Sequence, residues 1–165
     1  MSKKVFAALV DDSGFERILA NFAPAKRAPV MKSAMLRGAV IVQKKVRSVW
    51  KASHPDSDLD RAILIGLYPS GGGAVVRRHY VKGGEGRDLS KRDPKYRAYI
   101  LNFFENGTKP RTTKGKIGSK YPKKRLNRGA VKALKMFAKG YSRRNAAIKE
   151  IERYLLVELA KQARK

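Results

Sequence analysis

The feature that most constrains this chain is a long segment without an acidic residue. From Asn106 to Lys149 the sequence carries fifteen Lys and Arg residues and no Asp or Glu. The whole chain of 165 residues has a formal net charge of +26, whereas a charge of about 2 to 8 is enough to keep a small domain soluble. Because like charges repel in a compact state, this excess implies an anionic partner or a crowded assembly. Nucleic acid, an acidic protein surface and an anionic membrane are the alternatives that the charge leaves open.

Composition otherwise indicates one folded domain, residues 1–165. Hydrophobic residues make up 42% of the chain, which is enough for a core to offset the entropy of ordering it. There is no cysteine, so disulfides, thiolate metal ligands and a cysteine nucleophile are excluded. The apolar run at residues 5–10 is too short for a signal peptide, and no run approaches the roughly 20 apolar residues of a membrane span. We therefore expect a soluble chain made in the cytoplasm, with no membrane partner.

The spacing of apolar residues predicts an α+β fold in which a small antiparallel sheet packs against a long helix, with additional N- and C-terminal helices. Helical spacing occurs in four segments, at residues 13–22, 29–50, 131–140 and from about 142 onward. β-Prone runs predict three strands, at residues 62–68, 74–81 and 96–105. The Gly-rich and basic stretches at residues 83–95 and 107–128 are expected to be long flexible loops or arms.

Capping and turn residues predict where these helices begin and end. Ser13 and Glu16 fit a capping box at the start of the first helix. Pro24 is expected to stop that helix, and Pro29 is suited to the first turn of the long second helix. Gly140 is expected to close the third helix.

One acidic cluster resembles the beginning of a calcium loop. Asp56, Asp58 and Asp60 stand at alternate positions, from which carboxylates converge on a hard cation in such loops. However, Arg61 stands where a glycine is needed, and Leu67 stands where the bidentate Glu should be. We therefore expect a solvated loop before a strand and no metal site.

Other motifs that carry chemistry are also incomplete. The glycine runs at residues 71–73 and 83–86 lack the Lys-Ser/Thr pair of a nucleotide-binding loop. His54 and His79 have no Cys or second His at ligand spacing. No nucleophile elbow, triad order or paired carboxylates stand out. The sequence predicts no catalytic residues, no cofactor and no enzymatic activity.

The candidate contact residues are instead the cations that follow Asn106-Gly107. Such cations bind phosphate backbone with an affinity that falls steeply with salt, and Tyr121 alone does not form a platform for base stacking. The alternative is that they order against acidic patches of neighbouring subunits or of an adjacent ring. The residues concerned are Lys109, Arg111, Lys114, Lys116, Lys120, Lys123, Lys124, Arg125 and Arg128.

Residues 96–111, YRAYILNFFENGTKPR, resemble a pattern in the neck and tail-completion proteins of long-tailed bacteriophages. In that family an aromatic-rich strand runs into a Phe/Glu-Gly-Thr turn. The passage over residues 52–65 is similar to the family's as well. Two departures are the inserted Asn106 and, after the turn, a basic loop followed by RGAVKALKMFAKGY in place of the family's compact Pro-Phe-Leu stretch. The residues that match the turn are Phe104, Glu105, Gly107 and Thr108.

The resemblance implies a structural virion protein of the phage neck, a ring-forming head–tail connector or tail-completion component. Its implied partners are further copies of the chain, neighbouring connector and tail proteins, and the genome DNA in the channel. Its implied location is the virion, after assembly in the host cytoplasm. Because a lumen that DNA crosses quickly should not grip phosphate, we expect residues 109–128 to lie against neighbouring subunits or an adjacent ring. A nucleic-acid-binding structural protein of ribosomal or nucleoid type is the alternative, and a toxin or nuclease-like enzyme a weaker one.

Overall fold

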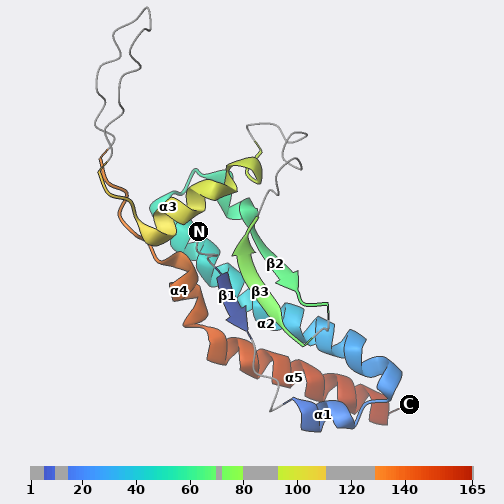
Figure 1. Cartoon of the computed structure of the whole chain (residues 1–165). Coiled ribbons are helices and arrows are strands. Elements are labelled where there is room, and N and C mark those ends of the chain that lie inside the picture. Colours follow the sequence, from blue (N-terminus) through green and yellow to red (C-terminus); the bar gives the residue numbers. More distant parts are fainter. Residues whose placement is uncertain (1–5, 10–14, 70–71, 80–92, 111–128, 165) are drawn as a thin grey trace, which may run out of the picture.

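The computed structural model describes residues 6–9, 15–69, 72–79, 93–110 and 129–164. In this part of the chain a small antiparallel sheet lies against one long helix (Figure 1), which confirms the predicted α+β class. None of the described helices combines the length and the apolar character needed to cross a bilayer. In chain order the elements are β1 (Phe6–Leu9), α1 (Glu16–Ala20), α2 (Pro24–Ser53), the 3-10 helix η1 (Asp58–Ala62), β2 (Ile63–Leu67), β3 (Ala74–Arg78), the 3-10 helix η2 (Tyr96–Tyr99), α3 (Ile100–Asn106), α4 (Met136–Tyr141) and α5 (Arg144–Ala163).

Helix α2 is the centre of the fold. One face of it is apolar and fully buried, including Val42, Val46 and Trp50, because apolar residues recur every three or four positions. The helix begins one turn earlier than predicted, since Pro24 occupies its first position rather than ending α1. Pro29 therefore lies inside the helix and not in its first turn.

Other predicted helix ends also differ from the structure. Phe15 precedes α1 and makes no side-chain cap, while Ser13 of the predicted capping box lies outside the described residues. Residues 131–135 are not helical, and α4 begins only at Met136. Gly140 lies inside α4, where it packs against Val46 of α2 instead of ending the helix.

The sheet has the strand order β1-β3-β2, and both pairings are antiparallel. The β2–β3 hairpin agrees with the prediction, but the third strand does not. Residues 96–105 form η2 and α3, and β1 takes the third place in the sheet. The buried positions Ala98, Leu101 and Glu105 have helical spacing, whereas the prediction relied on aromatic and β-branched content.

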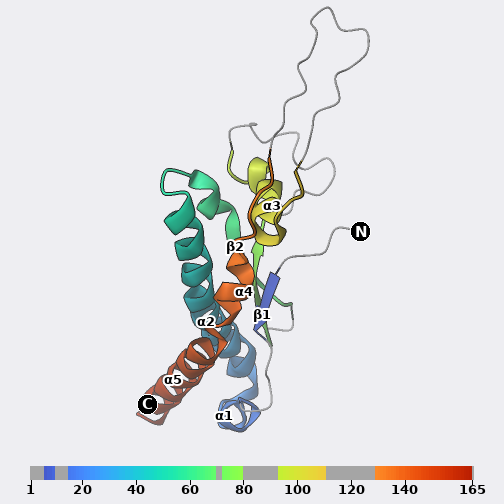
Figure 2. The same cartoon turned by 90° about the vertical axis from the view of Figure 1, so that its left-hand side faces the viewer.

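Helix α5 packs antiparallel along α2, on a different side from the sheet (Figure 2). Gly38 of α2 makes this approach possible, because a Cβ atom there would lie 2.7 Å from Cδ1 of Ile151 and 3.0 Å from the carbonyl oxygen of Ala147. Further along the pair, the Arg37 guanidinium lies 4.4 Å from the centre of the Tyr154 ring. The α2–α5 contact thus closes the core on the side away from the sheet.

Candidate functional site at the base of the basic segment

The structure places the four residues of the turn motif at the end of α3, where the basic segment begins. Among the nine predicted contact cations, Lys109 is described and exposed. The other eight, from Arg111 to Arg128, lie outside the described residues. The part of the site that can be described is therefore its base, by which we mean residues 107–110, where the chain leaves the domain, and residues 129–135, where it returns.

Thr108 and Val131 join the two ends of the segment. The Thr108 N–H donates to the Val131 carbonyl (N to O, 2.9 Å), and the Val131 N–H donates to Oγ1 of Thr108 (3.1 Å). The two residues form an isolated antiparallel bridge. The chain therefore leaves and re-enters the domain at one point, although 22 residues separate the two bridge positions.

Gly107 makes the turn into this bridge. Its φ of +72° and ψ of 173° belong to a region that residues with a Cβ atom rarely adopt. A Cβ atom at this position would also lie 2.9 Å from the Val131 carbonyl oxygen. Glycine is required here for two independent reasons, backbone conformation and space.

Glu105 connects α3 to the first turn of α4. Its carboxylate is buried and accepts hydrogen bonds from the N–H groups of Phe137 (Oε2, 3.0 Å) and Ala138 (Oε1, 3.4 Å). These amides have no partner within the helix, and the residue before α4, Lys135, has no side-chain acceptor to cap them. Glu105 supplies the missing cap from another helix, with its negative charge at the positive helix end.

Phe104 ties this connection between α3 and α4, which we call the joint, to the core. Its backbone carbonyl accepts a hydrogen bond from the Leu134 N–H (2.6 Å). Its ring meets Trp50 and His54 edge to face, with centroids at 5.1 Å and 4.6 Å. Trp50 and His54 are themselves stacked at 4.2 Å. His54 is therefore part of an aromatic cluster that links α3 to the end of α2.

Two of the three aspartates that resemble a calcium loop, Asp58 and Asp60, each pair with a cation. Asp58 accepts two hydrogen bonds from Nη2 of Arg97 (2.8 and 2.9 Å), which ties η1 to η2. Asp60 lies 3.3 Å from Nζ of Lys51. Within the described ranges, no group of three His, Cys, Asp or Glu side chains is arranged to hold a metal ion.

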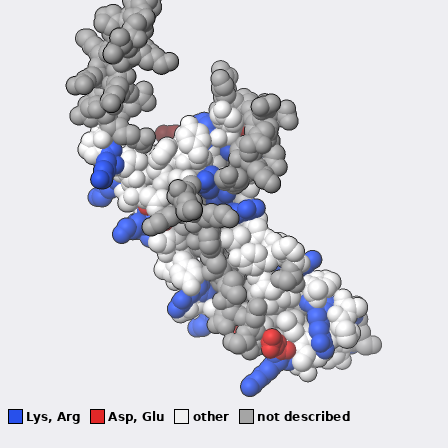
Figure 3. All heavy atoms as spheres, in the orientation of Figure 1, with Lys and Arg blue, Asp and Glu red and all other residues white. Residues whose placement is uncertain are grey.

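The surface around the base is basic. Exposed cations follow the returning chain into α4, and Figure 3 shows Lys and Arg side chains beside the point where the grey segment leaves the domain. Sequence reasoning did not identify these residues as part of the site, because they lie more than 20 positions after the turn. They are Lys132, Lys135 and Lys139.

Sequence reasoning also did not identify the residues on the returning side of the joint. Val131, Phe137 and Ala138 contribute only backbone groups, and no side-chain pattern identifies a backbone group as a partner of Glu105 or Thr108. The one trace of the joint in the sequence is the Glu-Asn-Gly-Thr run itself. Comparisons of the chain with protein-family models, curated protein sequences and solved structures find no significant match.

Proposed function

We propose that the protein is a structural component of a phage neck, which forms a ring as a head–tail connector or tail-completion protein. One observation carries the proposal. The residues that resemble the family turn, Phe104, Glu105, Gly107 and Thr108, all make contacts at the place where the basic segment leaves and re-enters the domain. The resemblance therefore coincides with an architectural unit, which is what a shared structural role requires.

The joint suits an adaptor because it displays a long segment from a fixed point. Its cap, its glycine turn and its bridge each hold the base, while residues 109–130 connect the two sides of the bridge. In the proposed ring these cations lie against acidic surfaces of neighbouring subunits or of the adjacent ring. That placement neutralises the charge without holding the DNA that moves through the channel.

Assembly of the purified protein tests the proposal. Light scattering and electron microscopy of the chain, alone and mixed with the products of the neighbouring genes, should reveal a ring. A chain that stays monomeric at high concentration and in every mixture contradicts the proposal. The truncation that replaces residues 109–130 by a short Gly-Ser linker should keep the fold, because the bridge positions are adjacent, and should weaken contacts with partners.

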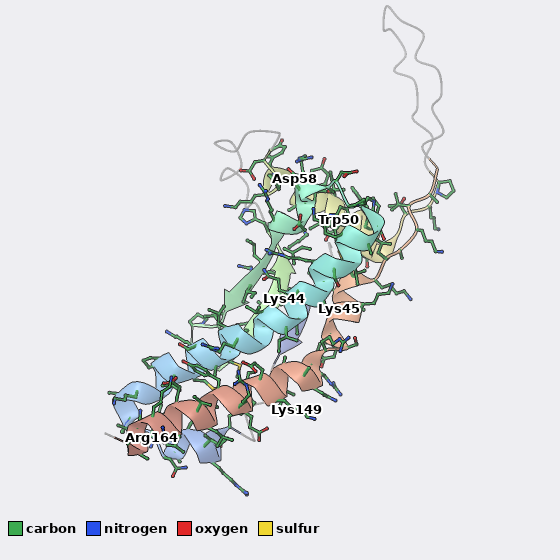
Figure 4. The ribbon with its side chains drawn as sticks, turned by 180° about the vertical axis from the view of Figure 1, so that it is seen from behind. Lys44, Lys45, Trp50, Asp58, Lys149 and Arg164 are labelled. Atoms are coloured by element: carbon green, nitrogen blue, oxygen red, sulfur yellow. The ribbon has the colours of Figure 1, made fainter. Side chains whose placement is uncertain are left out.

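A second function, binding to nucleic acid, is favoured by the cations on the back of the molecule. Lys44, Lys45 and Lys149 lie on α2 and α5 on the side seen in Figure 4. No described acidic residue forms an ion pair with any of the three. Fluorescence anisotropy with duplex DNA at increasing salt separates the two functions. Tight binding at physiological salt with a steep salt slope favours the nucleic-acid role.

A further inference from the structure

Strand β2 forms one edge of the sheet, because the strand order is β1-β3-β2 (Figure 1). Its pairing with β3 shows which of its backbone groups are used. The Tyr68 N–H donates to the Gly73 carbonyl (3.0 Å), and the His79 N–H donates to the Ala62 carbonyl (2.7 Å). Bonded and non-bonded pairs alternate along an antiparallel ladder, so every second residue from Ala62 to Tyr68 bonds to β3. The residues between them point their N–H and C=O groups away from β3, toward the open edge.

These outward-pointing residues are Ile63, Ile65 and Leu67. The Ile63 carbonyl is already engaged, since it accepts hydrogen bonds from Nε2 of Gln43 (2.8 Å) and Nη2 of Arg47 (3.0 Å). No described residue forms a hydrogen bond with the outward N–H or C=O group of Ile65 or Leu67. The edge therefore offers the donors and acceptors of two alternate residues to an added strand.

The sequence of β2 does not protect this edge. Exposed edge strands are usually shielded by charged side chains, by proline or by a β-bulge. Strand β2, Ile-Leu-Ile-Gly-Leu, contains no charged residue and no proline, and its register with β3 is continuous from Ile63 to Leu67. In a chain with a net charge of +26, an uncharged and regularly paired edge is well suited to strand addition.

The outer face of the hairpin places a cation over this edge. Arg77 and Gly66 lie on the sheet face away from α2, because residues of a strand alternate between faces and their neighbour Val76 is buried. Gly66 has no side chain, and Nε and Nη2 of Arg77 lie 3.3 and 3.7 Å from the point where its Cβ would be. The guanidinium therefore crosses β2 toward the edge. Arg77 is exposed and pairs with no carboxylate among the described residues.

The elements around the edge supply no free acid for this cation. Helix α2, which covers the inner face of the sheet, carries Lys and Arg at several positions and no Asp or Glu. Strands β2 and β3 have no acidic residue either. The aspartates of η1, which precedes β2, already pair with Arg97 and Lys51. An added strand therefore meets uncompensated positive charge at this edge.

The inner side of the edge is apolar. Leu67 is 39% exposed and lies on the face covered by α2, since it pairs with the buried Ala74. Leu36 of α2 is 44% exposed. It lies two turns before Gln43, on the face from which Gln43 reaches the Ile63 carbonyl, and the end of β2 lies beside the N-terminal half of α2 (Figure 1). Apolar side chains of an added strand can therefore pack against Leu67 and Leu36.

We propose that the open edge of β2 binds an extended segment of a partner protein, in which apolar residues alternate with Asp or Glu. The segment pairs with the outward backbone groups of Ile65 and Leu67. Its apolar side chains lie on the inner side and its carboxylates on the outer side near Arg77, because side chains alternate between faces and adjacent strands lie about 4.8 Å apart. This binding does not depend on the proposed function, since it requires no ring.

A second copy of the chain matches this edge less well. Pairing of β2 with β2 across a two-fold axis would place two α2 helices, each with Lys and Arg and no acid, on the same face of one continuous sheet. Pairing of β2 with β1 of a second copy, Phe-Ala-Ala-Leu, supplies no carboxylate for Arg77. The charge around the edge thus favours a different protein with an acidic strand.

Model peptides test the proposal. The probe is a short capped peptide that alternates Val and Glu, titrated into the full chain at physiological ionic strength and followed by NMR. The amide signals of Ile65 and Leu67 should shift and their hydrogen exchange should slow, because these N–H groups become bonded. A matched peptide that alternates Val and Lys should bind about tenfold more weakly or less. The Val–Glu peptide with methylated backbone nitrogens keeps its charge but should not bind, since it lacks the donors of a strand.

Two variants of the protein test the two parts of the edge. Leu67→Pro removes an outward N–H without breaking the ladder to β3, and should weaken binding of the Val–Glu peptide by about tenfold. Leu67→Ala keeps the N–H and should lose less affinity. Arg77→Glu should also weaken this binding by about tenfold and should reverse the preference toward the Val–Lys peptide. Lys149→Glu makes the same change of charge at an exposed position on α5 and should leave binding close to that of the unaltered protein.

Several results would overturn the proposal. One is a Val–Glu peptide that leaves the Ile65 and Leu67 amides unchanged, and another is equal binding of the methylated or the Val–Lys peptide. Undiminished binding to Leu67→Pro would show that the edge is not used; if circular dichroism shows that this variant does not fold, the methylated peptide and Arg77→Glu decide. Self-association of the unaltered chain that Leu67→Pro abolishes would make a second copy the occupant. Ring assembly is measured without these peptides, so failure of the proposed function is a separate result.

Discussion

Replacing Glu105 by Ala should destabilise the protein by about 1.5 to 3 kcal/mol. The substitution removes the carboxylate that accepts hydrogen bonds from two backbone N–H groups, the buried one of Phe137 (3.0 Å) and the half-buried one of Ala138 (3.4 Å). A buried donor left without a partner costs about 1 to 3 kcal/mol, and loss of a helix cap costs about 1 kcal/mol. Both figures describe the loss of the same contact, so they are not added. Because the acceptor is charged, a cost of about 1.5 to 3 kcal/mol applies, and the longer contact adds little.

Urea unfolding monitored by circular dichroism measures this change. For a chain of this size each kcal/mol corresponds to roughly 2 to 4 °C in Tm, so thermal unfolding offers a second measure. Glu105→Gln keeps one acceptor oxygen and should lose about half as much stability. Glu152→Ala removes an exposed glutamate and should stay within about 0.5 kcal/mol of the unaltered protein.

Hydrogen exchange resolves where the change acts. In Glu105→Ala, exchange at the amides of Phe137 and Ala138 should accelerate relative to the unaltered protein, since the first turn of α4 loses its cap. This acceleration should exceed that of amides in the middle of α2. A loss of stability below 0.5 kcal/mol, or unchanged exchange at these two amides, would refute the role given to Glu105.

Three further substitutions test the backbone geometry and the α2–α5 contact by the same unfolding assay. Gly38→Ala should cost about 1 to 3 kcal/mol, because its Cβ would meet Ile151 and the backbone of α5, whereas Ser33→Ala on the exposed face of α2 should be neutral or slightly stabilising. Gly107→Ala should cost about 2 kcal/mol or more, since the position combines φ of +72° with a close carbonyl oxygen; retention of full stability would show that the turn relaxes freely. Lys135→Gly relieves a φ of +50° and should leave stability unchanged or raise it by up to about 1 kcal/mol; a clear loss would contradict this account of Lys135.

Sequence patterns predicted the long helix, the β2–β3 hairpin and the C-terminal helix because each has a strong local period. Val42, Val46 and Trp50 recur at helical spacing, and they are buried in α2 as expected. The same method failed for residues 96–105, where Tyr, Ile and Phe suggested a strand. There the burial of Leu101 and Glu105 against the core decided for a helix, which local propensity does not encode.

For the candidate site, too, some features could be predicted from the sequence and others could not. The sequence by itself determined the charge, the glycine at position 107 and the abrupt change from apolar to basic residues after Asn106. These are properties of single residues and their neighbours. The absence of acids between Asn106 and Lys149 is also evident from the sequence alone, and it is the basis for expecting a partner that supplies negative charge.

Only the tertiary structure decided what holds the base of the segment. The bridge from Thr108 to Val131 and the cap from Glu105 to Phe137 join positions that are 23 and 32 residues apart. Each bond ends on a backbone N–H, which every residue except proline carries, so no side-chain pattern marks the partner. Only the fold brings the end of α3 to the start of α4. The residues of the turn motif thereby contact a part of the chain that is distant in sequence.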